Sequence, residues 1–313
     1  MPEVNTADKL NKKYLREDMW PTIFCNGCGH GVVLDYTFWA IEELGLDMDK
    51  TVFVSGIGCS SRLPGYINAD GLHTTHGRAL AFATGVKAAN PDLNIIVFTG
   101  DGDCSGIGGN HLIHAARRNI DMTVIMINNF TYGMTGGQLS PTAPLGSIAT
   151  TAPYGNIEHP FDICELVKAL GANYVARWPV SHPYKPVKSV KAGLEKKGFS
   201  LIEFFSPCPT AYGRRNKLGD IKKHWQWYDD NTILIEDYEK IMNYGSDEEK
   251  EETKNKMKIG VFQDIQKPGF FEQYEKLLER LQDKRGKGVR NEKRDTYLWF
   301  RWPRSDSIWF HLW

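Results

Sequence analysis

The stretch Gly100-Asp101-Gly102-Asp103 follows an apolar run over residues 93–99, and Asn128-Asn129 closes the next apolar run, which begins at Met122. Each run has the length and composition of a buried strand. Mg²⁺ prefers oxygen ligands and commonly bridges a protein to a diphosphate. Asp101, the Asn129 carboxamide and the Thr131 carbonyl would supply three such oxygens. The neighbouring glycines would let a diphosphate approach the backbone closely.

Strand and helix patterns alternate along the chain and indicate an α/β fold. This alternation implies a mainly parallel sheet with helices on both faces and with ligands beyond the carboxyl ends of the strands. Strands are expected over 51–55, 93–99, 122–128, 174–176 and 201–205, and helices over 32–44, 77–89, 107–118, 161–170 and 187–196. Asp101, Asn129, Cys59 and Cys208 each fall just after an expected strand. We therefore expect these four residues on one rim of the sheet.

Four of the six cysteines lie in three separated loops that are rich in glycine and proline. The pair Cys25 and Cys28 belongs to Cys-Asn-Gly-Cys, Cys59 follows Gly-Ile-Gly, and Cys208 stands between two prolines. Four thiolates gathered from such loops can hold one tetrahedral zinc ion or one cubane iron–sulfur cluster. Spacing alone does not separate the two. A redox centre is favoured because Cys59 lies at a strand end where an organic cofactor would also bind.

The other two cysteines have simpler interpretations. Cys104 and Cys164 fit small buried hydrophobic residues. A disulfide framework is disfavoured because the chain begins without a secretory signal pattern and is too long to need stapling.

The Gly-Asp-Gly and Asn-Asn pair is similar to the signature of thiamine diphosphate enzymes, although Gly-Asp-Gly alone is common in turns. With the cysteine loops, the chain resembles the β subunits of 2-oxoacid:ferredoxin oxidoreductases, and the 2-oxoglutarate type most closely. The segments that carry this resemblance are 25–30, 55–62, 73–78, 100–103 and 128–138, and more weakly 206–210 and 259–262.

This resemblance implies a thiamine-diphosphate-binding fold and a set of cofactor residues. Mg²⁺ would be held by Asp101, Asn129 and Thr131, and a [4Fe–4S] cluster by the four loop cysteines. The positions that match the family's thiamine contacts are Ile57, Gly58, Cys59, Ser60, His76, Gly102, Asp103, Gly133 and Met134.

The resemblance also implies a reaction and partners. The reaction would be oxidative decarboxylation of 2-oxoglutarate with coenzyme A and ferredoxin, and a separate α subunit would carry the pyrimidine-side domain. We expect His76 and Arg62 to act at the reaction centre, with the Arg62 guanidinium holding the second carboxylate of the substrate. The alternatives are a pyruvate-specific or broad-specificity β subunit, a thiamine enzyme without a redox step, and a zinc-binding scaffold.

Composition is consistent with this interpretation and bears on nucleic-acid binding, membrane spans and domain organisation. The 313 residues carry a formal net charge of zero, which gives no indication of nucleic-acid binding, and 41% of them are hydrophobic. The apolar runs are too short to span a bilayer, so a cytoplasmic location is expected. We expect a cofactor domain over 1–213, a C-terminal extension over 214–290, and a tryptophan-rich tail over 291–313 that folds back or binds a partner.

Overall fold

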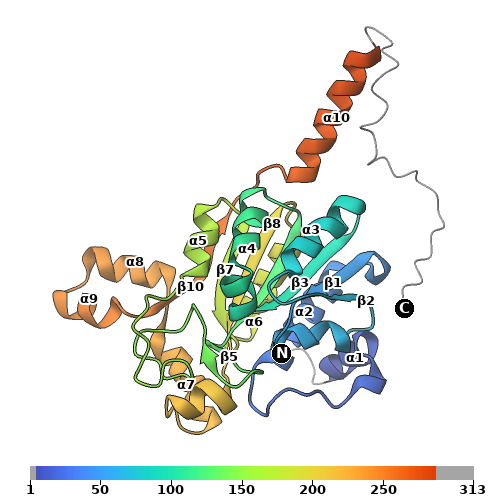
Figure 1. Ribbon diagram of the computed structural model, residues 1–313. Coiled ribbons are helices and arrows are strands. Elements are labelled where there is room, and N and C mark those ends of the chain that lie inside the picture. Colours follow the sequence, from blue (N-terminus) through green and yellow to red (C-terminus); the bar gives the residue numbers. More distant parts are fainter. Residues whose placement is uncertain (1–4, 287–313) are drawn as a thin grey trace.

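β-branched and aromatic residues dominate the central strands, and the packing of the sheet follows from them. The computed structural model describes residues 5–286 and contains an eight-stranded sheet covered by helices (Figure 1). Its centre is formed by β1 (Thr51–Ser55), β3 (Asn94–Gly100), β4 (Met122–Asn128) and β8 (Phe199–Phe205), which are parallel to one another. The expected mainly parallel α/β fold is therefore confirmed.

The strand order is β2-β1-β3-β4-β8-β7-β10-β9. Every neighbouring pair is parallel except β10 with β7, which is antiparallel and has a shift of register between Val261 and Gln263. The outer strands of this sheet are β2 (Asp70–His73), β7 (Tyr174–Pro179), β9 (Thr232–Leu234) and β10 (Met257–Asp264). A separate two-stranded ribbon consists of β5 (Thr131–Tyr132) and β6 (Gln138–Leu139).

Side chains that alternate along the strands build two apolar cores, one on each face of the sheet. Phe53, Phe98 and Ile125 face a core that includes α2 (His30–Leu44) and α6 (Tyr184–Glu195), while Val54 and Val97 face the other. Helix α1 (Asn5–Tyr14) joins the first core. The second core includes α3 (Ala79–Ala89), α4 (Gly109–Arg117) and α5 (Ile163–Ala169). Two covered faces leave the strand ends as the natural place for a ligand.

Residues 102–107 explain why one helix begins later than its sequence pattern suggested. The expected helix over 107–118 starts at Gly109, because the chain first makes a π-type helical turn directly after Asp101. Gly108 closes this turn, and a β-carbon there would overlap the Asp103 carbonyl oxygen. This π-type turn keeps residues 101–103 at the carboxyl end of β3.

The part of the chain beyond residue 213 extends the same sheet and adds projecting helices. It contributes β9 and β10, together with α7 (Ile221–Asn231), α8 (Ile235–Tyr244), α9 (Asp247–Thr253) and α10 (Phe270–Gly286). In Figure 1, α8 and α9 project to the left and α10 extends upward from the sheet. The charge-rich run over 247–252 lies within α9, and the segment from Phe270 onward forms α10. The tail over 291–313 lies outside the described residues.

One ion pair is enclosed where β7 and β8 are neighbours. Arg177 Nε donates to Glu203 Oε2 at 2.6 Å, and Arg177 Nη2 donates to Asp162 Oδ1 at 2.6 Å. Arg177 and Glu203 are both almost fully buried. The guanidinium also lies over the rings of Phe205 and Phe262, with its carbon 5.2 and 5.0 Å from the ring centres. The pair is thus desolvated on all sides.

Arg177→Met should lower the free energy of unfolding by about 3–5 kcal/mol, because it leaves the Glu203 carboxylate buried without its cation. Lys191→Met is the matched control, since its pair with Glu43 is more exposed and the nitrogen–oxygen distance is 3.2 Å. That control should cost less than about 1 kcal/mol. Denaturant unfolding monitored by circular dichroism measures both. Equal losses in the two variants would contradict the argument.

Candidate functional site

Four neighbouring strands bring the predicted ligands to one edge of the sheet. Because β1, β3, β4 and β8 are parallel and adjacent, their carboxyl ends lie side by side. Asp101 and Asn129 directly follow β3 and β4, and Cys59 and Cys208 lie in the loops after β1 and β8. The sequence-based expectation of a common rim agrees with this arrangement.

Asp101 is a buried carboxylate in an environment that lacks a compensating positive charge. Thr142 Oγ1 donates to its Oδ2 at 2.9 Å, and no Lys or Arg within residues 5–286 forms an ion pair with it. Burial raises the pKa of this carboxyl to about 6, against the hydroxyl bonds that lower it. A divalent cation at this point would supply the missing charge, so Asp101 fits a Mg²⁺ ligand.

A local kink in the backbone presents Asn129 and Thr131 beside Asp101. Phe130 has a φ of +61°, a left-handed conformation that is unusual for a side chain of this size. The Asn128 carboxamide oxygen accepts the Phe130 N–H at 3.1 Å, and the Phe130 ring packs 5.4 Å from the rings of Phe205 and Tyr212. These contacts hold the kink. Asn129 and Thr131 line the same cavity as Asp101.

This first cavity has a volume of about 90 Å³ and gathers the residues that were expected to contact thiamine diphosphate. We call it the cofactor cavity. Its lining contains all nine expected contact residues, namely Ile57, Gly58, Cys59, Ser60, His76, Gly102, Asp103, Gly133 and Met134. Glycines on three separate loops leave main-chain groups exposed to it, as close approach of a diphosphate requires.

The carboxylate of Asp103 is occupied by the protein itself. Its Oδ1 accepts from the backbone N–H groups of Ile57 and Gly77, at 3.3 and 2.7 Å, and lies 2.6 Å from His76 Nδ1. Its Oδ2 accepts from Thr99 Oγ1 at 2.8 Å. Only the main chain here is therefore suited to meet a diphosphate, while the side chain ties three loops together.

The four loop cysteines line a second, larger cavity of about 270 Å³, which we call the cysteine cavity. Cys25 is exposed, Cys28 and Cys59 are half-buried, and Cys208 is buried. Burial, together with the nearby Cys208, Cys25 and Cys28 thiols, raises the pKa of Cys59 to about 11. Burial likewise raises the pKa of Cys28. Such thiols become thiolates only when a metal supplies positive charge, which fits a cluster site.

Two hydrogen bonds tie the first cysteine loop to Ser206, two residues before the fourth cysteine, and to helix α7. The Gly29 N–H donates to Ser206 Oγ at 3.0 Å, and Trp225 Nε1 on α7 donates to the Gly27 carbonyl at 2.9 Å. Gly27 has a φ of +84°, and a β-carbon there would overlap Ile221. The loop can therefore lie close against α7 only with glycine at this position.

The size of the cysteine cavity bears on the choice between zinc and a cluster. Within residues 5–286, no three His, Cys, Asp or Glu side chains are arranged to hold a single metal ion. Zinc requires four sulfurs within about 2.3 Å of one point. A β-carbon on Gly133 would be 3.4 Å from Cys208 Sγ and 3.7 Å from Cys59 Sγ, so glycine keeps the space between the sulfurs open. An open cavity among four thiols suits a cubane cluster better than one ion.

The two cavities share a wall, and His30 is part of it. Five residues line both cavities: His30, Cys59, Asn129, Gly133 and Met134. The His30 ring stacks on Phe24 with their centres 5.1 Å apart. Its Nδ1 is fully buried and has no hydrogen-bond partner within residues 5–286, and burial lowers the pKa of this imidazole to about 4. His30 is thus an uncharged polar group between the two cavities.

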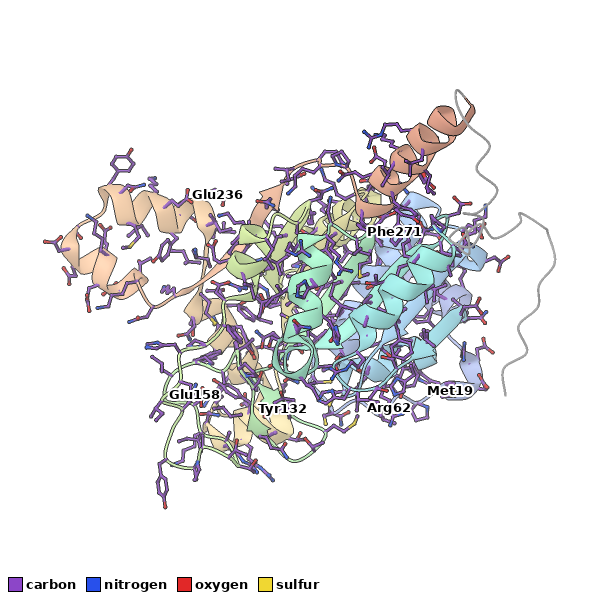
Figure 2. All side chains as sticks on the ribbon, turned by 45° about the horizontal axis from the view of Figure 1, so that its top comes forward. Met19, Arg62, Tyr132, Glu158, Glu236 and Phe271 are labelled. Atoms are coloured by element: carbon purple, nitrogen blue, oxygen red, sulfur yellow. The ribbon has the colours of Figure 1, made fainter. Side chains whose placement is uncertain are left out.

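Sequence reasoning missed several residues of the cofactor cavity. Tyr132 lines it and donates from its hydroxyl to the Gly102 carbonyl at 3.1 Å. Thr142 lies outside the lining and donates to Asp101. A Gly-His pair directly after the second cysteine was the available signal for His30. Arg62, in contrast, is exposed and lines neither cavity. Figure 2 shows Tyr132 and Arg62 along the same edge of the molecule.

Comparisons with known proteins agree with this geometry. Residues 56–204 match the family of C-terminal TPP-binding domains of thiamine pyrophosphate enzymes, TPP being the diphosphate named above. The chain is 53% identical to the 2-oxoglutarate synthase subunit KorB of Methanocaldococcus jannaschii, over 86% of this chain and 97% of that protein. It is 51% identical to the KorB subunit of Methanothermobacter marburgensis, over 91% and 96% of the two chains.

A solved structure is similar over most of its length. It is a 2-oxoglutarate:ferredoxin oxidoreductase from Magnetococcus marinus with 2-oxoglutarate, coenzyme A and succinyl-CoA bound; it is 34% identical, with a TM-score of 0.75, over 87% of this chain and 90% of that one. No helix among the described residues is long and apolar enough to cross a membrane. The family expected from the sequence motifs is confirmed. The chain belongs to the β subunits of the 2-oxoacid:ferredoxin oxidoreductases, in the 2-oxoglutarate synthase KorB group, and contains the thiamine-diphosphate-binding domain of that family.

Proposed function

We propose that this chain holds thiamine diphosphate, Mg²⁺ and one [4Fe–4S] cluster in an enzyme that oxidises 2-oxoglutarate. With coenzyme A, the products are succinyl-CoA and carbon dioxide, and two electrons pass to ferredoxin. The observation that carries the proposal is the wall shared by the cofactor cavity and the cysteine cavity. Electrons released at one cavity have only this wall to cross before they reach the other.

When bound, thiamine diphosphate supplies an electron sink for breaking the bond beside a 2-oxo group, and the cluster supplies one-electron acceptance. The protein's part is to hold and orient these groups. Asp101, Asn129 and the Thr131 carbonyl would bind Mg²⁺, and the main chain at Gly102 and Gly133 would lie beside the diphosphate. The Cys59 loop would contribute to both centres, since it lines both cavities.

The chain needs partners to complete this reaction. The pyrimidine-side domain of the cofactor pocket, which supplies an activating carboxylate in this family, would come from an α subunit. Cys25 is the exposed member of the cysteine set, so the cluster would lie near the surface on that side. Electrons could leave there to ferredoxin, a carrier that binds and dissociates. Coenzyme A would enter with the 2-oxoacid at the assembled site.

Cys208→Ala should remove or degrade the cluster, because it takes away the only cysteine ligand from the loop after β8. Cys164→Ala is the matched control, since Cys164 is also buried but its thiol donates to Glu203 at 3.2 Å instead of facing the cysteine cavity. Iron content and visible absorbance of anaerobically purified protein provide the measurement. Full iron content in Cys208→Ala would exclude Cys208 as a ligand.

Asp101→Asn should abolish retention of thiamine diphosphate while leaving iron content unchanged. The substitution keeps the size of the side chain but removes the charge that would balance Mg²⁺ and hold the diphosphate through it. Cofactor content of the isolated variant, measured by fluorescence after oxidation to thiochrome, tests this. Normal thiamine diphosphate content would mean that the metal is bound elsewhere.

Arg62→Ala should lower kcat/KM for 2-oxoglutarate much more than for pyruvate. The proposed bond from the guanidinium to the second carboxylate is worth about 2–3 kcal/mol, as for other hydrogen bonds to charged groups. Pyruvate has no second carboxylate and serves as the internal control. Steady-state kinetics of the assembled enzyme with both substrates would settle the matter. Equal losses for the two would assign Arg62 a general role instead.

A further inference from the structure

His76 lines the cofactor cavity and is held there through one ring nitrogen. Asp103 Oδ1 lies 2.6 Å from His76 Nδ1, on a carboxylate that also accepts from Ile57 N–H, Gly77 N–H and the Thr99 hydroxyl. An ionised carboxylate has no proton to donate. With three other donors already directed at it, Asp103 is in the form that only accepts. The proton between Asp103 and His76 therefore belongs to Nδ1.

We propose that Asp103 is a positioning residue that fixes His76 as the Nδ1–H tautomer, so that Nε2 presents a lone pair to the cofactor cavity. The identity of the ligand in the cavity rests on the proposed function, whereas the tautomer of His76 does not. In the neutral ring, one nitrogen carries hydrogen and the other accepts. A hydrogen bond that keeps the hydrogen on Nδ1 therefore leaves Nε2 as the acceptor.

The surroundings of Asp103 favour this role over direct contact with a diphosphate. Its side chain is only 3% exposed, and a β-carbon on Gly56 would overlap its carboxylate oxygens. The negative charge of Asp103 would also repel a diphosphate placed directly against its carboxylate. The expected contribution of Asp103 to cofactor binding is therefore limited to its backbone, and its carboxylate acts through His76.

Within residues 5–286, the only hydrogen bond of the His76 ring is the one at Nδ1, so no acceptor at Nε2 favours the reverse tautomer. Tyr132 is its aromatic neighbour, with ring centres 6.1 Å apart in an edge-on arrangement, but the Tyr132 hydroxyl donates to the Gly102 carbonyl. The Asp103 carboxylate keeps Nδ1 as a donor and the ring in place, so Nε2 is left free to accept from a donor in the cavity. His76 would thus act as a proton acceptor at Nε2, with Asp103 setting its orientation.

Nitrogen NMR of the full chain, labelled with [¹⁵N]histidine and free of iron and thiamine diphosphate, tests the tautomer directly. The His76 signals are identified by their loss in His76→Gln. The wild-type chain should show a protonated Nδ1 and a bare Nε2. Thr99→Val, which removes only the bond to Oδ2, should keep this pattern. Asp103→Ala should shift His76 toward the Nε2–H form.

Two NMR results would overturn the tautomer proposal. One is an Nε2–H tautomer of His76 in the wild-type chain, which decides the question even if Asp103→Ala fails to fold. The other is an unchanged tautomer in folded Asp103→Ala. Because the NMR measurement needs neither cofactor, a wrong tautomer can be told apart from a wrong assignment of the cofactors. In the assembled enzyme, Asp103→Ala should lower kcat on the order of 10²-fold, as loss of general-base catalysis does; unchanged kcat would exclude the proposed role of His76.

Discussion

The parallel pairing of β1, β3, β4 and β8 is the constraint on which the site depends. Parallel neighbours place their carboxyl ends at one edge, so four loops distant in sequence meet there without any long excursion. Two of these loops carry the oxygen ligands proposed for Mg²⁺, and two carry thiols proposed for the cluster. The Cys59 loop lines both cavities, which explains why they share a wall instead of lying apart.

A buried chain of polar contacts connects the core of the sheet to this edge. Arg177 pairs with Glu203, whose Oε1 accepts from the Asn128 carboxamide at 2.7 Å. The Asn128 carboxamide oxygen and the Asp101 carboxylate each lie 2.9 Å from Thr142 Oγ1. The Thr142 hydroxyl has a single hydrogen, so it can donate to only one of them at a time. The charge on Asp101 therefore sets the direction of this contact.

Motif spacing and strand patterns were sufficient to predict the central strands and the common rim, because each depends on local sequence. The two ligand sets stay predictions, although their residues line the two cavities. The antiparallel placement of β10 beside β7 was not predictable, since it depends on pairing between segments far apart in the chain. For the same reason, the sequence alone assigned no role to His30 and gave Asp103 a cofactor contact. Their roles follow from distances to Phe24 and His76 that exist only in the folded chain.

The most direct test is a crystal structure of the assembled enzyme with thiamine diphosphate and Mg²⁺ bound, together with an anomalous map collected at the iron absorption edge. The account predicts one iron cluster inside the cysteine cavity, between Cys25, Cys28, Cys59 and Cys208, and a diphosphate beside Asp101 across the wall that contains His30. A single zinc ion among the four cysteines, or a diphosphate bound away from Asp101, would contradict it.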